Sequence, residues 1–265
     1  MKIMRFLDRD GHVRYGQPVD ERSARIIEGD ICANPRPTDR TVTVAKRLPP
    51  IDPPNVYAIG LNYRQHAAES GMPIPKAPVI FLKATTSVTG PNSPIILPAS
   101  APDEVDYECE LAIIISRLAR DVSEDRALDY VLGYTCGNDV SARDCQARLD
   151  VQWARAKSFD TFCPLGPVIV TPDEIDGDNR PIRTILNGQV MQDSNTNDMI
   201  FGCRTLVSYL SHQFTLLPGT VIMTGTPSGV GFARKPPVFL RDGDEVSIEI
   251  DGIGRLTNPV VRDKR

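Results

Sequence analysis

The chain has 265 residues, the length of one large domain or of one domain with a small appendage. Its 41% hydrophobic and 24% charged residues are ordinary for a globular protein, and a net charge of −4 gives no reason to expect a nucleic acid or an anionic membrane as a partner. No segment approaches the about 20 apolar residues that span a bilayer, and the N-terminus lacks the apolar core of a signal peptide. The six cysteines form no Cys-x-x-Cys pair, so we expect reduced thiols in a cytoplasmic protein.

The first 45 or so residues are expected to form short strands with turns, with strands at 1–7 and 12–15 around the turn Asp8-Arg-Asp-Gly11. The proline-rich stretch 48–54 cannot be a helix or a central strand, so it is expected to be a linker. A larger second domain is expected over residues 55–265.

Longer apolar strands are expected in this second domain at 56–59, 79–82, 111–115, 168–170, 221–224 and 246–250, with hairpin turns at Asn187-Gly188 and Asp251-Gly252. Helices are expected at 123–131, 141–148 and 204–213. Strands dominate without a regular βαβ alternation, so the sequence predicts a strand-rich α+β fold.

Two glutamates stand directly ahead of the apolar run at 111–115, in Val105-Asp-Tyr-Glu-Cys-Glu-Leu111. On a strand, Glu108 and Glu110 would project from the same face. Neighbouring carboxylates repel each other, and a divalent cation removes that cost; an all-oxygen site suits Mg²⁺, Mn²⁺ or Ca²⁺. The spacing alone leaves a solvated acidic strand end as an equal alternative.

A third carboxylate, Asp139, lies where an expected strand meets an expected helix, a common place for catalytic groups. A plain helix N-cap is the alternative. If the helix is continuous, Arg143 and Gln146 share its face with Asp139, and Arg143 could bind a substrate carboxylate in a bidentate manner. A surface ion pair of Arg143 with Asp144 or Asp150 is the other possibility.

Five segments resemble the fumarylacetoacetate hydrolase family and occur in the family's order from about residue 55 to the C-terminus. They are Val56-Tyr-Ala-Ile-Gly-Leu-Asn-Tyr-Arg-Gln-His-Ala-Ala-Glu-Ser-Gly71, Asp106-Tyr-Glu-Cys-Glu-Leu-Ala112, Gly137-Asn-Asp-Val-Ser-Ala-Arg-Asp144, Ala156-Lys-Ser-Phe159 and Met223-Thr-Gly-Thr-Pro-Ser-Gly-Val-Gly231. The resemblance implies a mixed β-roll of the family's C-terminal type, a small N-terminal β domain over residues 1–50, and a homodimer.

The resemblance also implies one Mg²⁺ or Mn²⁺ ion per chain, with Glu108, Glu110 and Asp139 as its ligands. His66 and Glu69 are implied as a dyad, and one helical turn would place them on the same face. The carboxylate would fix the imidazole tautomer and let the other nitrogen deprotonate water. The proline-rich segment 71–78 could order over a substrate as a lid.

Three further positions follow from the same resemblance. Lys157 would place its ammonium beside the metal and stabilise charge that develops on the substrate. The alternative is an ordinary lysine on the surface, exposed to solvent. Thr226, in a Gly-rich loop that lacks the ending of a nucleotide-binding P-loop, would donate to the substrate carboxylate. Gln146 resembles a residue that helps control the enol form of the substrate in some relatives.

The family chemistry implied is that of a small 2-oxo acid that reacts through a metal-bound enolate. The His66–Glu69 dyad tilts the expectation toward hydrolysis of the C–C bond of an acylpyruvate, a 2,4-dioxo acid of the fumarylpyruvate or acetylpyruvate type. Oxaloacetate decarboxylation or tautomerisation, and isomerisation of 2-hydroxyhepta-2,4-diene-1,7-dioate, are alternatives on the same site. A protein that binds a metal or a small acid without turnover is the alternative of another class.

Overall fold

The computed structural model describes residues 1–149 and 152–264. Twelve of the described strands form one large sheet. Ten of them follow one another in the order β4 (Arg36–Thr43), β3 (Ser23–Glu28), β2 (Val13–Pro18), β1 (Lys2–Leu7), β14 (Cys163–Val170), β12 (Val131–Asn138), β11 (Cys109–Ile115), β17 (Val221–Met223), β6 (Val56–Gly60) and β7 (Val79–Lys83). Two short strands, β5 (Lys46–Arg47) and β8 (Val88–Thr89), pair with β1 and β14.

A second sheet of five described strands packs against the large one. Its order is β16 (Gln189–Asn195), β15 (Pro181–Leu186), β18 (Glu245–Ile250), β19 (Gly254–Arg262) and β9 (Ile95–Leu97). A short pair joins β10 (Val105–Asp106) to β13 (Ser141–Ala142). The helical elements are few: α1 (Arg64–Glu69), α2 (Trp153–Ala156), α3 (Cys203–Gln213), a π-helix (Cys145–Leu149) and 3₁₀ turns at Thr85–Ser87, Glu124–Tyr130, Thr196–Asp198 and Gly231–Ala233. The predicted strand-rich fold class is confirmed.

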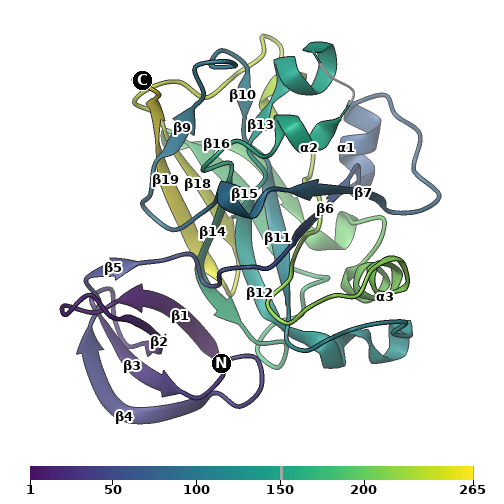
Figure 1. Cartoon of the computed structure of the whole chain (residues 1–265). Helices are drawn as coiled ribbons and strands as arrows, with labels where there is room; N and C mark the ends of the chain where they lie inside the picture. The colour runs from purple at the N-terminus through teal and green to yellow at the C-terminus, as the bar shows by residue number, and fades with distance from the viewer. Residues whose placement is uncertain (150–151, 265) are drawn as a thin grey trace.

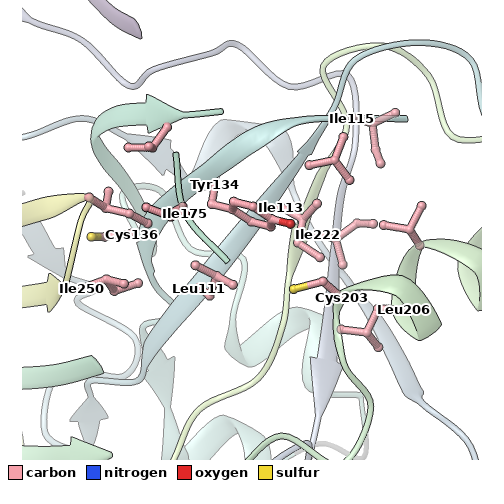
Figure 2. Packing of buried hydrophobic residues seen from close by; sticks show 14 of the residues in the cluster. Leu111, Ile113, Ile115, Tyr134, Cys136, Ile175, Cys203, Leu206, Ile222 and Ile250 are labelled. Atoms are coloured by element: carbon pink, nitrogen blue, oxygen red, sulfur yellow. The ribbon is translucent and has the colours of Figure 1, made fainter. Parts of the chain in front are cut away.

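Strand β11 explains how the core is built, because it is buried on both faces. Leu111, Ile113 and Ile115 pack in one cluster with residues of β12, β18 and α3 (Figure 2). The alternate residues Ala112 and Ile114 belong to a second cluster on the other face. Successive side chains of a strand point to opposite faces, so a strand between two layers needs an apolar residue at every position. Glu110 lies on the face of Ala112, at the end of the strand where this apolar run stops.

The N-terminal strands β1 to β5 lie to one side of the larger part of the chain (Figure 1). An irregular segment follows β5, where the linker was expected. Strand β1 nevertheless pairs with β14 through Lys2 with Val170 and Ile3 with Ile169, so the two parts share a sheet. The division into domains at 1–50 and 55–265 stays a prediction.

Two expected helices differ in the structure. The segment expected as a helix from residue 141 begins as strand β13, whose residues Ser141 and Ala142 pair with Asp106 and Val105, and only then coils into the π-helix. Tertiary pairing has overridden local helix propensity here. The segment at 123–131 is a 3₁₀ helix, whereas the third expected helix is α3. Among the described residues, no helix has the length and apolar character needed to cross a membrane.

Candidate active site

Three buried carboxylates meet at the ends of β11 and β12. Glu108 directly precedes β11, Glu110 lies in it, and Asp139 directly follows β12. The antiparallel register pairs Cys109 with Asn138 and Glu110 with Gly137, and the Asp139 N–H donates to the Glu108 carbonyl at 3.0 Å. Each residue offers a carboxylate oxygen, and these oxygens lie within 4.8 Å of one another. The structure therefore brings the three predicted ligands together, and their burial excludes the solvated strand end.

The structure also excludes the alternative role of Asp139 as a plain helix N-cap. It is not the N-cap of a helix, because strand β13 begins two residues later. Its carboxylate instead accepts from two buried lysines. Lys157 Nζ donates to Asp139 Oδ2 at 2.6 Å, and Lys83 Nζ donates to Asp139 Oδ1 at 2.5 Å. Lys83 also donates to the backbone carbonyl of Lys157, so it helps to hold Lys157 in position.

Lys157 is 3% exposed, so it is not a solvated surface lysine. Its ammonium donates to Glu108 Oε2 at 2.9 Å and to Ser141 Oγ at 2.7 Å, in addition to Asp139. Burial alone would lower the pKa of Lys157, but the negative charges of Asp139 and Glu108 outweigh it and raise the pKa. Lys157 therefore carries a fixed positive charge beside the carboxylates.

Arg143 has partners other than those expected. Its guanidinium lies 2.8 Å from Asp106 Oδ2 and 2.7 Å from Glu108 Oε1, and it donates to Gln146 Oε1 at 2.7 Å. Asp144 is not among these partners, and Asp150 lies outside the described residues. The ring of Phe232 lies 4.4 Å from the guanidinium carbon, in cation–π geometry. Arg143 therefore holds Glu108 in place, while its predicted contact with a substrate carboxylate stays a prediction.

The three carboxylates differ in their charge balance. Burial alone would raise the pKa of Glu108, but Lys157 and Arg143 lower it to about 2. Burial and the negative charges of Asp139 and Glu108 raise the pKa of Glu110 well above its usual value. Glu110 has no ion-pair partner among the residues that the structure describes, and its Oε2 accepts the Gly225 N–H at 2.8 Å.

The surrounding groups test whether a divalent cation fits. Four buried acids, Asp106 with the three predicted ligands, face three buried bases, Arg143 with the two lysines. With every group ionised, one negative charge remains in excess, and Glu110 is the acid that forms no ion pair with any described residue. A hard divalent cation held by carboxylate oxygens would reverse this sign and relieve the repulsion. The donor set therefore fits Mg²⁺ or Mn²⁺, although which ion binds stays a prediction.

The predicted dyad is assembled on α1. His66 Nδ1 lies 3.3 Å from Glu69 Oε2, and the Gly229 N–H lies 3.0 and 3.1 Å from the two oxygens of Glu69. Burial would raise the pKa of Glu69, but the hydrogen bonds from His66 and Gly229 lower it. Because Glu69 occupies Nδ1, Nε2 is the nitrogen that can exchange a proton with a ligand.

A cavity of about 340 Å³ joins the carboxylates to the dyad. Its polar lining includes the three predicted ligands, His66, Lys157, Arg143, Gln146 and Thr226, which come from five separate parts of the chain. Its apolar lining includes Ile59, Leu61, Met72, Phe81, Trp153 and Phe232. Every predicted site residue except Glu69 lines this cavity, and Glu69 is bonded to one that does.

Sequence analysis missed Lys83 and gave no role to Asp106. Lys83 ends the apolar run Val79-Ile-Phe-Leu-Lys83 and is the buried residue of β7, so a lysine that closes an apolar run was the available signal. Asp106 stands two residues before Glu108 and accepts the N–H groups of Gly231 and Phe232 at 2.8 and 3.0 Å. Its bonds tie the Gly-rich loop to Arg143.

Comparison of the chain with known protein families identifies its family. Residues 55–261 match the family described as fumarylacetoacetate (FAA) hydrolase C-terminal, and residues 1–46 match the one described as Rv2993c-like, N-terminal. The chain belongs to the fumarylacetoacetate hydrolase family. It is thus a member of a family of metal-dependent enzymes, as the sequence motifs indicated.

Relatives in this family carry several names. The chain is 49% identical over 217 residues to oxaloacetate tautomerase fahd2, mitochondrial, of Xenopus laevis, covering 81% of this chain and 68% of that protein. A solved 5-carboxymethyl-2-hydroxymuconate delta-isomerase from Mycobacterium smegmatis is 47% identical, with a TM-score of 0.87 and coverage of 99% and 100% of the two chains. A solved 2-hydroxyhepta-2,4-diene-1,7-dioate isomerase from Mycobacterium marinum is 45% identical, with the same TM-score and full coverage of both chains.

Proposed function

We propose that this protein is a divalent-metal-dependent enzyme that moves a proton between carbon and oxygen of a small 2-oxo acid, as a tautomerase or isomerase. The observation that carries the proposal is that one cavity places the carboxylate triad and the His66–Glu69 dyad together. The names of the relatives support the same class, because a 2-hydroxy-diene acid is the enol of a 2-oxo acid. Tautomerisation and isomerisation therefore share a proton transfer next to the 2-oxo group.

When bound by Glu108, Glu110 and Asp139, Mg²⁺ or Mn²⁺ would act as a Lewis acid on the 2-oxo acid and make the neighbouring C–H more acidic. His66 would carry the proton through Nε2, while Glu69 holds the tautomer through Nδ1. All three N–H groups of the Lys157 ammonium have acceptors in the structure, so this residue would act through its fixed charge. A cavity of about 340 Å³ lies in the range of small-molecule sites.

Hydrolysis of an acylpyruvate is the second candidate, and the dyad is what favours it. A histidine that is held by a carboxylate could deprotonate water as well as a substrate carbon. Product analysis separates the classes. A tautomerase or isomerase changes the ultraviolet spectrum of its substrate without altering the carbon skeleton, a hydrolase releases pyruvate from acetylpyruvate, and a decarboxylase releases CO₂ from oxaloacetate.

We therefore propose a panel of oxaloacetate, acetylpyruvate and 2-hydroxyhepta-2,4-diene-1,7-dioate, each assayed with Mg²⁺, with Mn²⁺ and with EDTA. The proposal predicts a metal-dependent spectral change without cleavage of the carbon skeleton for at least one diacid. Pyruvate release from acetylpyruvate as the fastest reaction would favour the hydrolase. No turnover of any substrate would favour a binding protein. The homodimer implied by the family also stays a proposal, and the mass of the protein in solution tests it.

A further inference from the structure

Gln192 is a buried amide, 1% exposed, on β16 of the second sheet. Its side chain bonds to groups on both sides of the boundary between the two sheets. Oε1 accepts the Cys109 N–H at 2.9 Å and the Thr184 hydroxyl at 2.7 Å. Nε2 donates to Thr226 Oγ1 at 2.9 Å and to the Pro227 carbonyl at 2.9 Å.

These partners fix which way the amide faces. A backbone N–H can only donate and a backbone carbonyl can only accept, so Cys109 requires the oxygen on its side and Pro227 requires the nitrogen on the other. A flipped amide would place oxygen against the Pro227 oxygen and NH₂ against the Cys109 N–H. Thr226 Oγ1 therefore accepts a hydrogen bond from Gln192.

The direction of that bond has a consequence for the cavity. A hydroxyl carries one hydrogen, and Thr226 does not use it in the bond with Gln192. Thr226 lines the cavity beside Glu108 and Glu110. We propose that Gln192 is a positioning residue that makes the Thr226 hydroxyl a hydrogen-bond donor toward the carboxylate of an acid bound in the cavity. This inference rests on the proposed function, since it assumes that the ligand is a 2-oxo acid.

Gln192 also supports strand β11 through its hydrogen bond with the Cys109 N–H, and the experiment must distinguish this structural role from the positioning of Thr226. The Cys109 N–H that it accepts lies between the two predicted metal ligands Glu108 and Glu110. If Gln192 served only to hold β11, its loss would weaken metal binding and acid binding together. If it sets the direction of the Thr226 hydroxyl, acid binding falls while metal binding stays.

The decisive variant is Gln192→Glu, which keeps the shape of the side chain. At a pH that ionises it, the introduced carboxylate only accepts, so it still serves Cys109 and Thr184 but draws the Thr226 hydrogen toward itself and away from the cavity. The probe is oxalate, a planar dianion that resembles the enolate of pyruvate. Its affinity for Mn²⁺-loaded protein, and the affinity of the metal-free protein for Mn²⁺, are measured separately by calorimetry.

We expect Gln192→Glu to weaken oxalate binding by about tenfold or more, the scale of one hydrogen bond to a charged group, with Mn²⁺ affinity unchanged. In a Thr226→Val background the same substitution should weaken oxalate binding less, because only the repulsion by the added charge remains once the hydroxyl is gone. Thr226→Ser, which keeps the hydroxyl, should retain oxalate binding. Thr184→Val is the matched control, since Cys109 and Pro227 still orient the amide.

Gln192→Met is the second variant, because it removes the amide without adding charge and lets the Thr226 hydroxyl rotate. Its loss of oxalate affinity should disappear in the Thr226→Val background. Equal losses with and without the hydroxyl, or a parallel loss of Mn²⁺ affinity, would overturn the inference while leaving the proposed function intact. Wild-type protein that binds Mn²⁺ but no oxalate would overturn both.

Discussion

The Gly229 N–H donates to the carboxylate of Glu69, with 3.0 and 3.1 Å to its two oxygens, although the residues are 160 positions apart in the chain. The Gly-rich loop that presents Thr226 to the cavity therefore also holds the acid that orients His66. Gly229 has a φ of +96°, and a Cβ there would lie 2.5 Å from the Met191 carbonyl oxygen. Only glycine fits this conformation and this space without strain.

Gly229→Ala is expected to lower turnover by more than its loss of folded protein accounts for. Strain of this kind costs about 1–3 kcal/mol, and the shifted loop would withdraw the donor that holds Glu69. The measurement is turnover at a temperature well below the melting point. Gly188→Ala is the matched control, since Gly188 has a φ of +81° with nothing within 4 Å and lies in a distant hairpin. If both variants lose turnover equally, the Glu69–Gly229 bond has no part in the reaction.

Glu110→Gln is expected to abolish metal binding without harming the metal-free protein. Because the pKa of Glu110 is raised in the fold, by burial and then by Asp139 and Glu108, its protonation stabilises the metal-free protein below its unfolded pKa. That stability is lost as the pH rises through the folded pKa. The variant lacks this loss, so in EDTA it should be at least as stable as wild type at high pH.

Thermal unfolding with increasing Mn²⁺ completes this test. The melting temperature of wild type should rise with metal concentration, and that of Glu110→Gln should not. The loss of affinity should exceed the about 10- to 100-fold typical of residues that only support a ligand. Glu245→Gln, at an exposed glutamate on β18, is the control. An equal Mn²⁺-induced shift in Glu110→Gln and wild type would show that Glu110 is not a ligand.

Lys157→Met is expected to lower kcat by about 10²–10³, the value of one fixed electrostatic contact in a buried site. Lys157 remains charged because Asp139 and Glu108 outweigh the effect of burial on its pKa. The effect should appear with every substrate that is turned over, whichever bond changes. Lys46→Met, at an exposed lysine in β5, is the control. A fall of less than fivefold would assign Lys157 to structure alone.

His66→Ala should distinguish proton transfer and hydrolysis from decarboxylation. Removal of a general acid or base typically costs about 10²–10⁴ in rate, so tautomerisation and any acylpyruvate cleavage should fall by this amount. Oxaloacetate decarboxylation needs no such base and should fall far less, and Glu69→Gln should show the same pattern more mildly. His12→Ala, at an exposed histidine in the turn between β1 and β2, is the control. An equal loss in all reactions would give His66 a role in closing the cavity.

Local patterns predicted the strands and hairpins well because apolar runs and turn residues act over a few positions. The Asn187-Gly188 turn joins β15 and β16, with φ of 50° and 81° at these residues, as a two-residue hairpin requires. The segment from residue 141 was mistaken for a helix because its pairing partner, β10, lies more than 30 positions earlier. Propensity holds no information about such a partner.

The carboxylates and the dyad were accessible from sequence because their members lie close together or in recognisable motifs. Lys83 and Gln192 were not. Lys83 reaches Asp139 across 56 positions, and Gln192 reaches Thr226 from another sheet. Arg143 was found, but its partner Asp106 was not, since an ion pair across 37 positions follows from strand pairing and not from spacing. Contacts of this kind appear only when the sheets are assembled.

The central claim, that the cavity catalyses metal-dependent proton transfer on a 2-oxo acid, is tested most directly with the enol form of oxaloacetate. Its conversion to the keto form is followed by the loss of enol absorbance, against buffer that contains the same metal. Metal-loaded wild type should accelerate the conversion, and both EDTA-dialysed wild type and Glu110→Gln should return it to the uncatalysed rate. A conversion that survives exhaustive removal of metal would contradict the account, and so would a conversion no faster than in buffer together with no metal-dependent isomerisation of 2-hydroxyhepta-2,4-diene-1,7-dioate.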